Sequence, residues 1–75
     1  MTDDQSTNVA SSGGVSQAER QLLAFLSEGL PTSAVARRLG VSERTVRRQI
    51  RDLCDRIGVS SRVEAIVWAT RRGVI

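Results

Sequence analysis

Residues 42–57 have the pattern of an amphipathic helix with two chemically opposite faces. At about 100° per residue, four aliphatic side chains fall on one stripe: Val46, Ile50, Leu53 and Ile57. Four arginines fall on the other side, within an arc of about 100°: Arg44, Arg47, Arg48 and Arg51. We therefore expect one side of this helix to pack against the rest of the fold. The other side presents planar guanidinium groups, which suit phosphate oxygens and guanine edges.

The charge of the chain favours a polyanionic partner. The 75 residues include 11 basic side chains, all of them arginine, and 8 acidic ones, for a formal charge of +3. Two of the acids, Asp3 and Asp4, lie near the N-terminus, and without them 11 basic and 6 acidic residues leave +5. Such an excess favours nucleic acid. Genome base composition is an alternative explanation for the use of arginine alone, but it does not explain the placement of four arginines on one face.

The composition argues against an enzyme and against a metal or cofactor site. The chain has no histidine and a single cysteine, Cys54, whereas a zinc site needs three or four ligands and a disulfide needs two cysteines. A domain of this length buries only about 60% of its unfolded surface, which leaves little room for a deep pocket. Cys54 lies beside the apolar stripe, so we expect it to be a small core residue.

Residues 1–14 are rich in small polar side chains and predict a disordered tail or linker ahead of a folded domain at residues 15–75. No apolar stretch approaches the roughly 20 residues of a membrane span, and no signal peptide is visible. These features predict a cytoplasmic protein without a membrane partner.

Two predicted helices in the middle of the chain are separated by a tight turn. Thr32 is expected to cap a short helix that ends at Gly40, and Ser42 to cap the arginine-bearing helix, which ends at Gly58. Only Gly40 and Val41 lie between the first helix and the cap of the second. This is a helix-turn-helix pattern, in which the second helix enters the major groove and the first braces it across the DNA backbone.

A helix on either side of this motif completes a predicted all-α, four-helix domain. The capping-box spacing occurs twice, as Ser16–Glu19 and Ser61–Glu64. The first box opens a helix that ends at Gly29. The second opens a helix that begins at residue 60 or 61 and runs to about residue 72.

Several separated motifs resemble the LuxR/GerE-type DNA-binding domain of bacterial transcription regulators. They agree with that family in order and spacing: Val15–Arg20, Gly29–Leu30, Val35–Ser42, Thr45–Val46, Gly58–Val59 and Ser61–Ala65. The resemblance implies a four-helix domain without a wing that binds double-stranded DNA as a homodimer through its fourth helix. Such domains are the effector domains of response regulators, the output domains of quorum-sensing receptors, or short stand-alone regulators. Sigma-factor region 4 shares the helix-turn-helix but usually lacks the Ser-Arg-x-Glu-Ala motif.

The resemblance also implies roles for individual side chains. The base- and phosphate-contacting positions of the family correspond to Arg44, Arg47, Arg48 and Arg51, and Thr45 corresponds to a phosphate contact. The dimer contact corresponds to Val63, Val67 and Thr70. The spacing of these three residues independently makes one stripe, for which the alternative is core packing against the first helix.

Three residues at predicted helix starts are further candidates for DNA contact: Thr32, Ser33 and Ser42. Ser42 is expected to cap its helix, and the amides at a helix start also bind phosphate, so both roles are compatible. Arg56 points roughly 180° away from Arg47, which predicts a structural role or a flanking phosphate contact.

Two alternatives to DNA reading remain open at this point. The arginines form a solvated face if Arg48–Asp52 and Arg51–Asp55, which have i,i+4 spacing, close as ion pairs worth a few tenths of a kcal/mol. A protein-interaction module that docks on RNA polymerase or a sigma factor is the second alternative, and the same two aspartates favour it.

Overall fold

The computed structural model describes residues 14–75, and the predicted tail lies outside these residues except for Gly14. Four helices make up the described part: α2 (Gln17–Ser27), α3 (Thr32–Leu39), α4 (Glu43–Ile57) and α5 (Arg62–Arg71). No strand occurs among these residues, which confirms the all-α, four-helix prediction.

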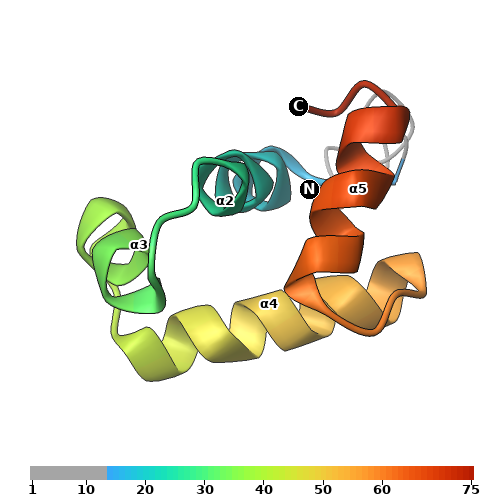
Figure 1. Ribbon diagram of the computed structural model, residues 1–75. Helices are drawn as coiled ribbons and strands as arrows, with labels where there is room; N and C mark the ends of the chain where they lie inside the picture. Colours follow the sequence, from blue (N-terminus) through green and yellow to red (C-terminus); the bar gives the residue numbers. More distant parts are fainter. Residues whose placement is uncertain (1–13) are drawn as a thin grey trace, which may run out of the picture.

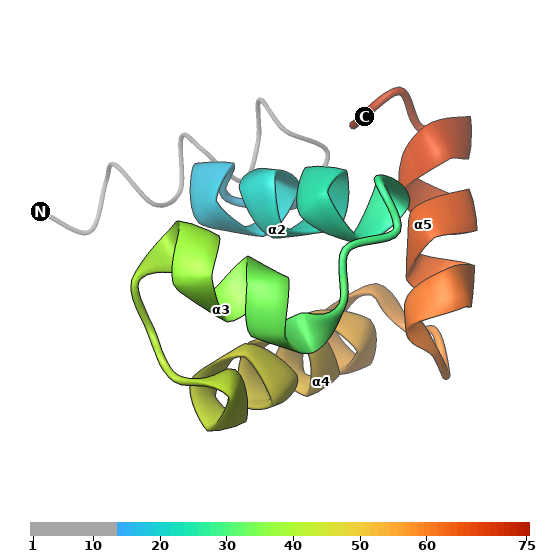
Figure 2. The same ribbon diagram turned by 60° about the vertical axis from the view of Figure 1, so that its left-hand side comes forward.

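The helices are arranged so that α4 lies along one side of the fold. α4 runs along the lower edge in Figure 1, where α3 packs on its N-terminal half and α5 rises from its C-terminal end. α2 packs against both α3 and α5. After a turn of the view, α2 lies above α3, with α4 beneath them and α5 closing one end (Figure 2). This arrangement leaves the outer side of α4 uncovered by the other three helices.

The core forms where the helices meet. Val46 and Leu53 of α4 are 0% and 1% exposed, and Ile50 and Ile57 are partly buried against them, which confirms the predicted apolar stripe. Other buried side chains come from α2, α3, α5 and the residue just before α2: Val15, Leu22, Leu23, Leu26, Val35, Ala36, Ala65 and Ala69. Cys54 is buried with them, as predicted.

The helix starts agree with the sequence prediction in part. At α2 the capping box is complete: Glu19 N donates to Ser16 Oγ at 3.1 Å, and Ser16 N donates to the Glu19 carboxylate at 2.9 Å. At α5, Glu64 N donates to Ser61 Oγ at 3.2 Å, but the Glu64 carboxylate accepts from Ser60 N at 2.7 Å. The second half of this box is therefore shifted by one residue toward the N-terminus.

The prediction that Thr32 caps the short helix is wrong. The capping position of α3 is Pro31, which is extended and makes no side-chain cap, and Thr32 is the first helical residue. The ring of Pro31 fixes φ, which is -69° here, and its carbonyl accepts from Ala34 N and Val35 N. The helix is therefore initiated one residue earlier than expected, and the Thr32 hydroxyl is left for other partners.

The turn of the helix-turn-helix depends on a left-handed glycine. Gly40 ends α3 with φ 73° and ψ 33°, and its amide donates to Ala36 O at 2.8 Å. Ser42 then caps α4 as predicted, since Thr45 N donates to Ser42 Oγ at 3.1 Å. This short connection holds α3 and α4 in the arrangement of the motif.

None of the helices in residues 14–75 has the length and apolarity needed to cross a membrane.

Candidate nucleic-acid interface

The four arginines of α4 gather on its outer side. Arg44, Arg47, Arg48 and Arg51 are all exposed, opposite the buried stripe, and together with Thr45 they line a shallow hollow in the surface. We call these five residues the arginine hollow. A concave surface lined by guanidinium groups is positive and presents many N–H donors in fixed planar geometry.

Carboxylates neutralise little of this surface. Arg47 Nη1 lies 3.4 Å from the Glu43 carboxylate, but the two side chains are 62% and 49% exposed, so the pair is worth at most about 1 kcal/mol. Within residues 14–75, neither Arg48–Asp52 nor Arg51–Asp55 closes as an ion pair. The guanidinium groups therefore remain available to an external anion.

The start of α4 adds hydroxyl groups beside the arginine hollow. Ser42 Oγ accepts the capping bond and donates its own proton to Thr45 Oγ1 at 3.0 Å. Because a threonine hydroxyl that accepts one hydrogen bond keeps its proton, Thr45 can still donate to a phosphate oxygen. Ser42 itself is exposed and acts as the cap of α4.

The start of α3 is a second place with free donors. The amides of Thr32 and Ser33 belong to the first turn, where backbone N–H groups have no intrahelical acceptor, and Pro31 offers no side-chain cap. The Thr32 hydroxyl accepts a hydrogen bond from Arg62 Nη2, with Nη2 and Oγ1 3.1 Å apart. Sequence reasoning missed Arg62, because nothing local joins residues 30 positions apart.

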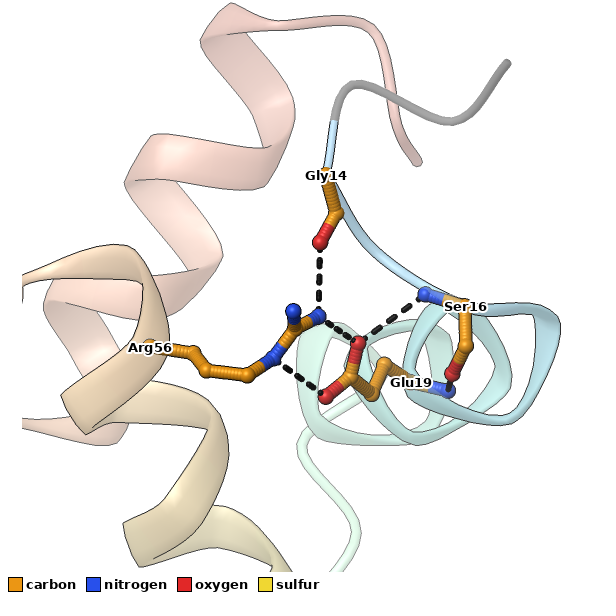
Figure 3. Close-up of polar contacts among 4 residues, drawn as sticks. All are labelled: Gly14, Ser16, Glu19 and Arg56. Carbon is orange, nitrogen blue, oxygen red and sulfur yellow. Dashed lines mark hydrogen bonds and ion pairs between the residues drawn. The ribbon is translucent and has the colours of Figure 1, made fainter. Parts of the chain in front are cut away.

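Arg56 has a structural role. Figure 3 shows its side chain leaving α4 toward α2, where Nε donates to Glu19 Oε2 at 3.1 Å and Nη2 contacts Glu19 Oε1. Nη2 also donates to the Gly14 carbonyl at 2.6 Å. Of the two roles expected for Arg56, the contacts support the structural one.

The candidate dimer stripe on α5 lies outside the core. Val63 and Val67 are 65% and 43% exposed, and Thr70 is exposed with its hydroxyl donating to Ile66 O at 2.8 Å. Val63 and Val67 border a shallow, mainly apolar hollow with Val59 and Trp68. Core packing within one chain, the alternative for this stripe, therefore does not account for these residues.

A family model described as bacterial regulatory proteins, luxR family, matches residues 14–69. The chain belongs to the luxR family. Families of this kind are DNA-binding regulators and not a class of enzymes. The match also covers the helix-turn-helix and most of α5, so the resemblance predicted from the separated motifs is confirmed.

Curated relatives of this luxR-family chain carry regulator names. It is similar to the nitrate/nitrite response regulator protein NarL of Escherichia coli (strain K12), with 40% identity over 50 residues, which are 67% of this chain and 23% of the relative. It is similar to the transcriptional regulatory protein YdfI of Bacillus subtilis (strain 168), with 37% identity over 54 residues, 72% of this chain and 25% of the relative. It also resembles the DNA-binding transcriptional activator DevR/DosR of Mycobacterium tuberculosis (strain ATCC 25618 / H37Rv), with 39% identity over 57 residues, 76% of this chain and 26% of the relative.

The luxR-family chain thus spans about a quarter of the length of these relatives. No solved structure gives a significant match. Family and relatives together support DNA-binding transcription regulation as the function of the domain.

Proposed function

We propose that this domain binds double-stranded DNA sequence-specifically, with α4 as the recognition helix in the major groove, and that it thereby regulates bacterial transcription. The observation that carries the proposal is the arginine hollow. It lies on the second helix of a helix-turn-helix, on the side that none of the other three helices in residues 14–75 covers. Because bacterial DNA lies in the cytoplasm, this function locates the chain there.

The position of each arginine along α4 indicates whether it contacts bases or phosphates. Recognition helices enter the groove by their N-terminal part. We therefore assign base reading to Arg44, Arg47 and Arg48, where a bidentate contact with guanine O6 and N7 gives about 1–3 kcal/mol of discrimination. Arg51 lies a turn further along and is assigned mainly to phosphate.

Phosphate contacts would flank the groove on two sides. Ser42 and Thr45 supply hydroxyl groups at the start of α4, and Thr32 and Ser33 supply hydroxyls and free amides at the start of α3. The N-terminal ends of both helices carry the positive end of the helix dipole, which favours phosphate.

A dimer on two half-sites would add the specificity that one small domain lacks. The exposed stripe of Val63, Val67 and Thr70 on α5 is the surface we propose for it, because exposed aliphatic side chains beside an apolar hollow favour burial against a second copy.

The proposed function is tested by titrating the chain with a mixed pool of duplex DNA at low salt, using fluorescence anisotropy and NMR shifts. DNA should shift the NMR signals of residues 42–51, and Arg47→Ala and Arg48→Ala should each weaken the binding. Arg37→Ala is the matched control, since Arg37 is also exposed but lies in the last turn of α3, outside the arginine hollow. Absence of binding by the unaltered chain at low salt contradicts the proposal.

Docking on RNA polymerase or a sigma factor is a second candidate function. Asp52 and Asp55 are exposed on α4, and neither forms an ion pair within the described part of the chain. Free carboxylates beside the arginines favour a protein partner that carries both charges. This candidate predicts no retention by duplex DNA and capture of the domain by the polymerase.

A further inference from the structure

One hydrogen bond connects the first residue of α5 with the first residue of α3. Arg62 Nη2 donates to Thr32 Oγ1 over 3.1 Å, and both residues are partly buried. Thr32 is one of the proposed phosphate contacts, whereas Arg62 belongs to the helix that carries the candidate dimer stripe. The contact therefore joins two surfaces that the proposed function uses separately.

The helix dipole of α5 does not favour the position of Arg62. A cation in the first turn of a helix faces the positive end of the dipole, which is unfavourable. Within residues 14–75, Arg62 has no carboxylate at ion-pair distance that would offset this cost. Its hydrogen-bond partner in this part of the chain is the neutral Thr32 hydroxyl.

Arg62 also borders the DNA-facing side of α4. It lines a surface hollow between α4 and the start of α5, and Arg47 and Arg51 line the same hollow. Both of these residues belong to the arginine hollow as well. This hollow, which Asp55 also lines, therefore connects the arginines of α4 with Arg62, whose hydrogen bond to Thr32 reaches the start of α3.

The contact determines what the Thr32 hydroxyl can do. A hydroxyl has one proton and two lone pairs, and the bond from Arg62 occupies a lone pair. The proton remains free, and a charged donor on the oxygen polarises the O–H bond and strengthens it as a donor. At the start of α3, where a phosphate is proposed to bind, an oriented O–H donor is the group required.

We propose that Arg62 is a positioning residue for DNA binding, which acts by holding the Thr32 hydroxyl as a donor to a backbone phosphate. This proposal rests on the proposed function, because it refines one of the phosphate contacts. Arg62 then affects the affinity for DNA by positioning Thr32, and not by contacting DNA itself.

A double-mutant cycle on the whole chain tests the proposal. The variants are Thr32→Val, which keeps the shape and removes the hydroxyl, Arg62→Met, which keeps the stem and removes the donor, and the double variant. Each single variant should weaken duplex binding about 5-fold, the value for the loss of one net hydrogen bond. The double variant should bind no more weakly than the weaker single one. Losses that multiply to about 25-fold would overturn the proposal.

Three further measurements separate positioning from other roles. Thr32→Ser keeps the hydroxyl and should retain nearly full affinity, and Arg62→Lys should lose less than Arg62→Met. If Arg62 binds phosphate itself, Arg62→Met lowers the slope of log K against log salt by about 0.9, which contradicts action through Thr32. Urea unfolding of every variant shows whether the lost affinity comes from lost fold. If Arg62→Met does not fold, the cycle is completed with Arg62→Ala, which also removes the donor.

The two proposals fail in different ways. If the unaltered chain does not bind duplex DNA at low salt, the proposed function fails. If the unaltered chain binds but Thr32→Val and Arg62→Met have no effect, or act independently, only the role of Arg62 fails.

Discussion

Arg56 of α4 forms a two-point ion pair with Glu19 of α2, and the same Glu19 carboxylate completes the capping box of α2 by accepting from Ser16 N (Figure 3). Arg56 also donates a hydrogen bond to the Gly14 carbonyl. A single carboxylate thus fixes the start of α2 and attaches it to the C-terminal end of α4. The pair is partly shielded, with the Arg56 and Glu19 side chains 46% and 23% exposed.

Replacing Arg56 should therefore reduce stability without reducing affinity for DNA. We expect Arg56→Met to lower the free energy of unfolding by about 1 kcal/mol, the value of a partly exposed pair with good geometry. Arg56→Lys should recover only part of the loss, since an ammonium group cannot reproduce the planar fork. Urea unfolding measures this effect, with Arg37→Met as an exposed control. A drop in duplex affinity for fully folded Arg56→Met would show that Arg56 contacts DNA.

The turn between α3 and α4 gives a test of backbone conformation alone. A Cβ built on Gly40 meets no heavy atom within 4 Å, so the cost of a side chain there comes from the left-handed φ of 73°. Gly40→Ala should therefore destabilise the fold by about 1–2 kcal/mol, and Gly40→Asn by less, because asparagine tolerates this region. Thermal or urea unfolding distinguishes the two. Equal losses for both variants would mean that the backbone conformation does not set the cost.

The sequence predicted the elements that depend on local chemistry. The ends of α4 follow from Ser42 and Gly58, which lie next to the helix they cap, and its exposed arginine side follows from periodicity. The predicted cap at Thr32 was wrong because Pro31 initiates α3 through its backbone alone, with a fixed φ and a free carbonyl. The identity of the side chain at Thr32 does not indicate that the helix begins one residue earlier.

Contacts between helices were beyond such reasoning. Arg56 meets Glu19 across 37 positions, and Arg62 meets Thr32 across 30. The sequence places each of these residues on its helix, but the crossing of the helices decides which side chains meet. A different limit applies within α4, where exposed i,i+4 pairs are weak and depend on residue order. The acid-first pair Glu43–Arg47 forms, whereas the base-first pairs Arg48–Asp52 and Arg51–Asp55 do not.

The arginine hollow predicts two kinds of DNA-binding defect. Arg51→Ala should weaken binding to all duplexes alike and lower the slope of log K against log salt by about 0.9, because it removes a phosphate contact. Arg48→Ala should instead relax the preference for the selected site over scrambled duplex, by about 1–3 kcal/mol. Anisotropy titrations at several salt concentrations separate the two. If both variants change only the salt slope, α4 does not read bases.

The exposed stripe of α5 predicts dimer assembly on DNA. Val67→Asp places a charge on the proposed contact, so a duplex with two half-sites should lose its second bound domain while a single half-site is bound as before. Val67 is 43% exposed, so the free domain should keep its fold. Analytical ultracentrifugation of the complexes measures the stoichiometry. Two Val67→Asp domains bound with unchanged cooperativity would exclude this surface as the dimer contact.

Stability should fall at alkaline pH because of a single thiol. Burial raises the pKa of Cys54 above its ordinary value of 9.0, and the nearby carboxylates of Asp55 and Glu64 raise it further, while Arg62 opposes them. Above pH 9.0 the unfolded chain therefore releases the thiol proton while the folded chain retains it, and this difference favours unfolding.

The composition makes this effect measurable. The chain has no tyrosine and no lysine, so Cys54 is its one side chain that titrates between neutral pH and the arginine range. Urea unfolding should show the free energy of unfolding constant from pH 7 to about 8 and then declining as pH rises toward the pKa of the folded thiol. Cys54→Ala lowers stability at every pH but should remove the decline. If the free energy of unfolding of Cys54→Ala declines equally at alkaline pH, another group causes the decline. The remaining candidate is the terminal amine.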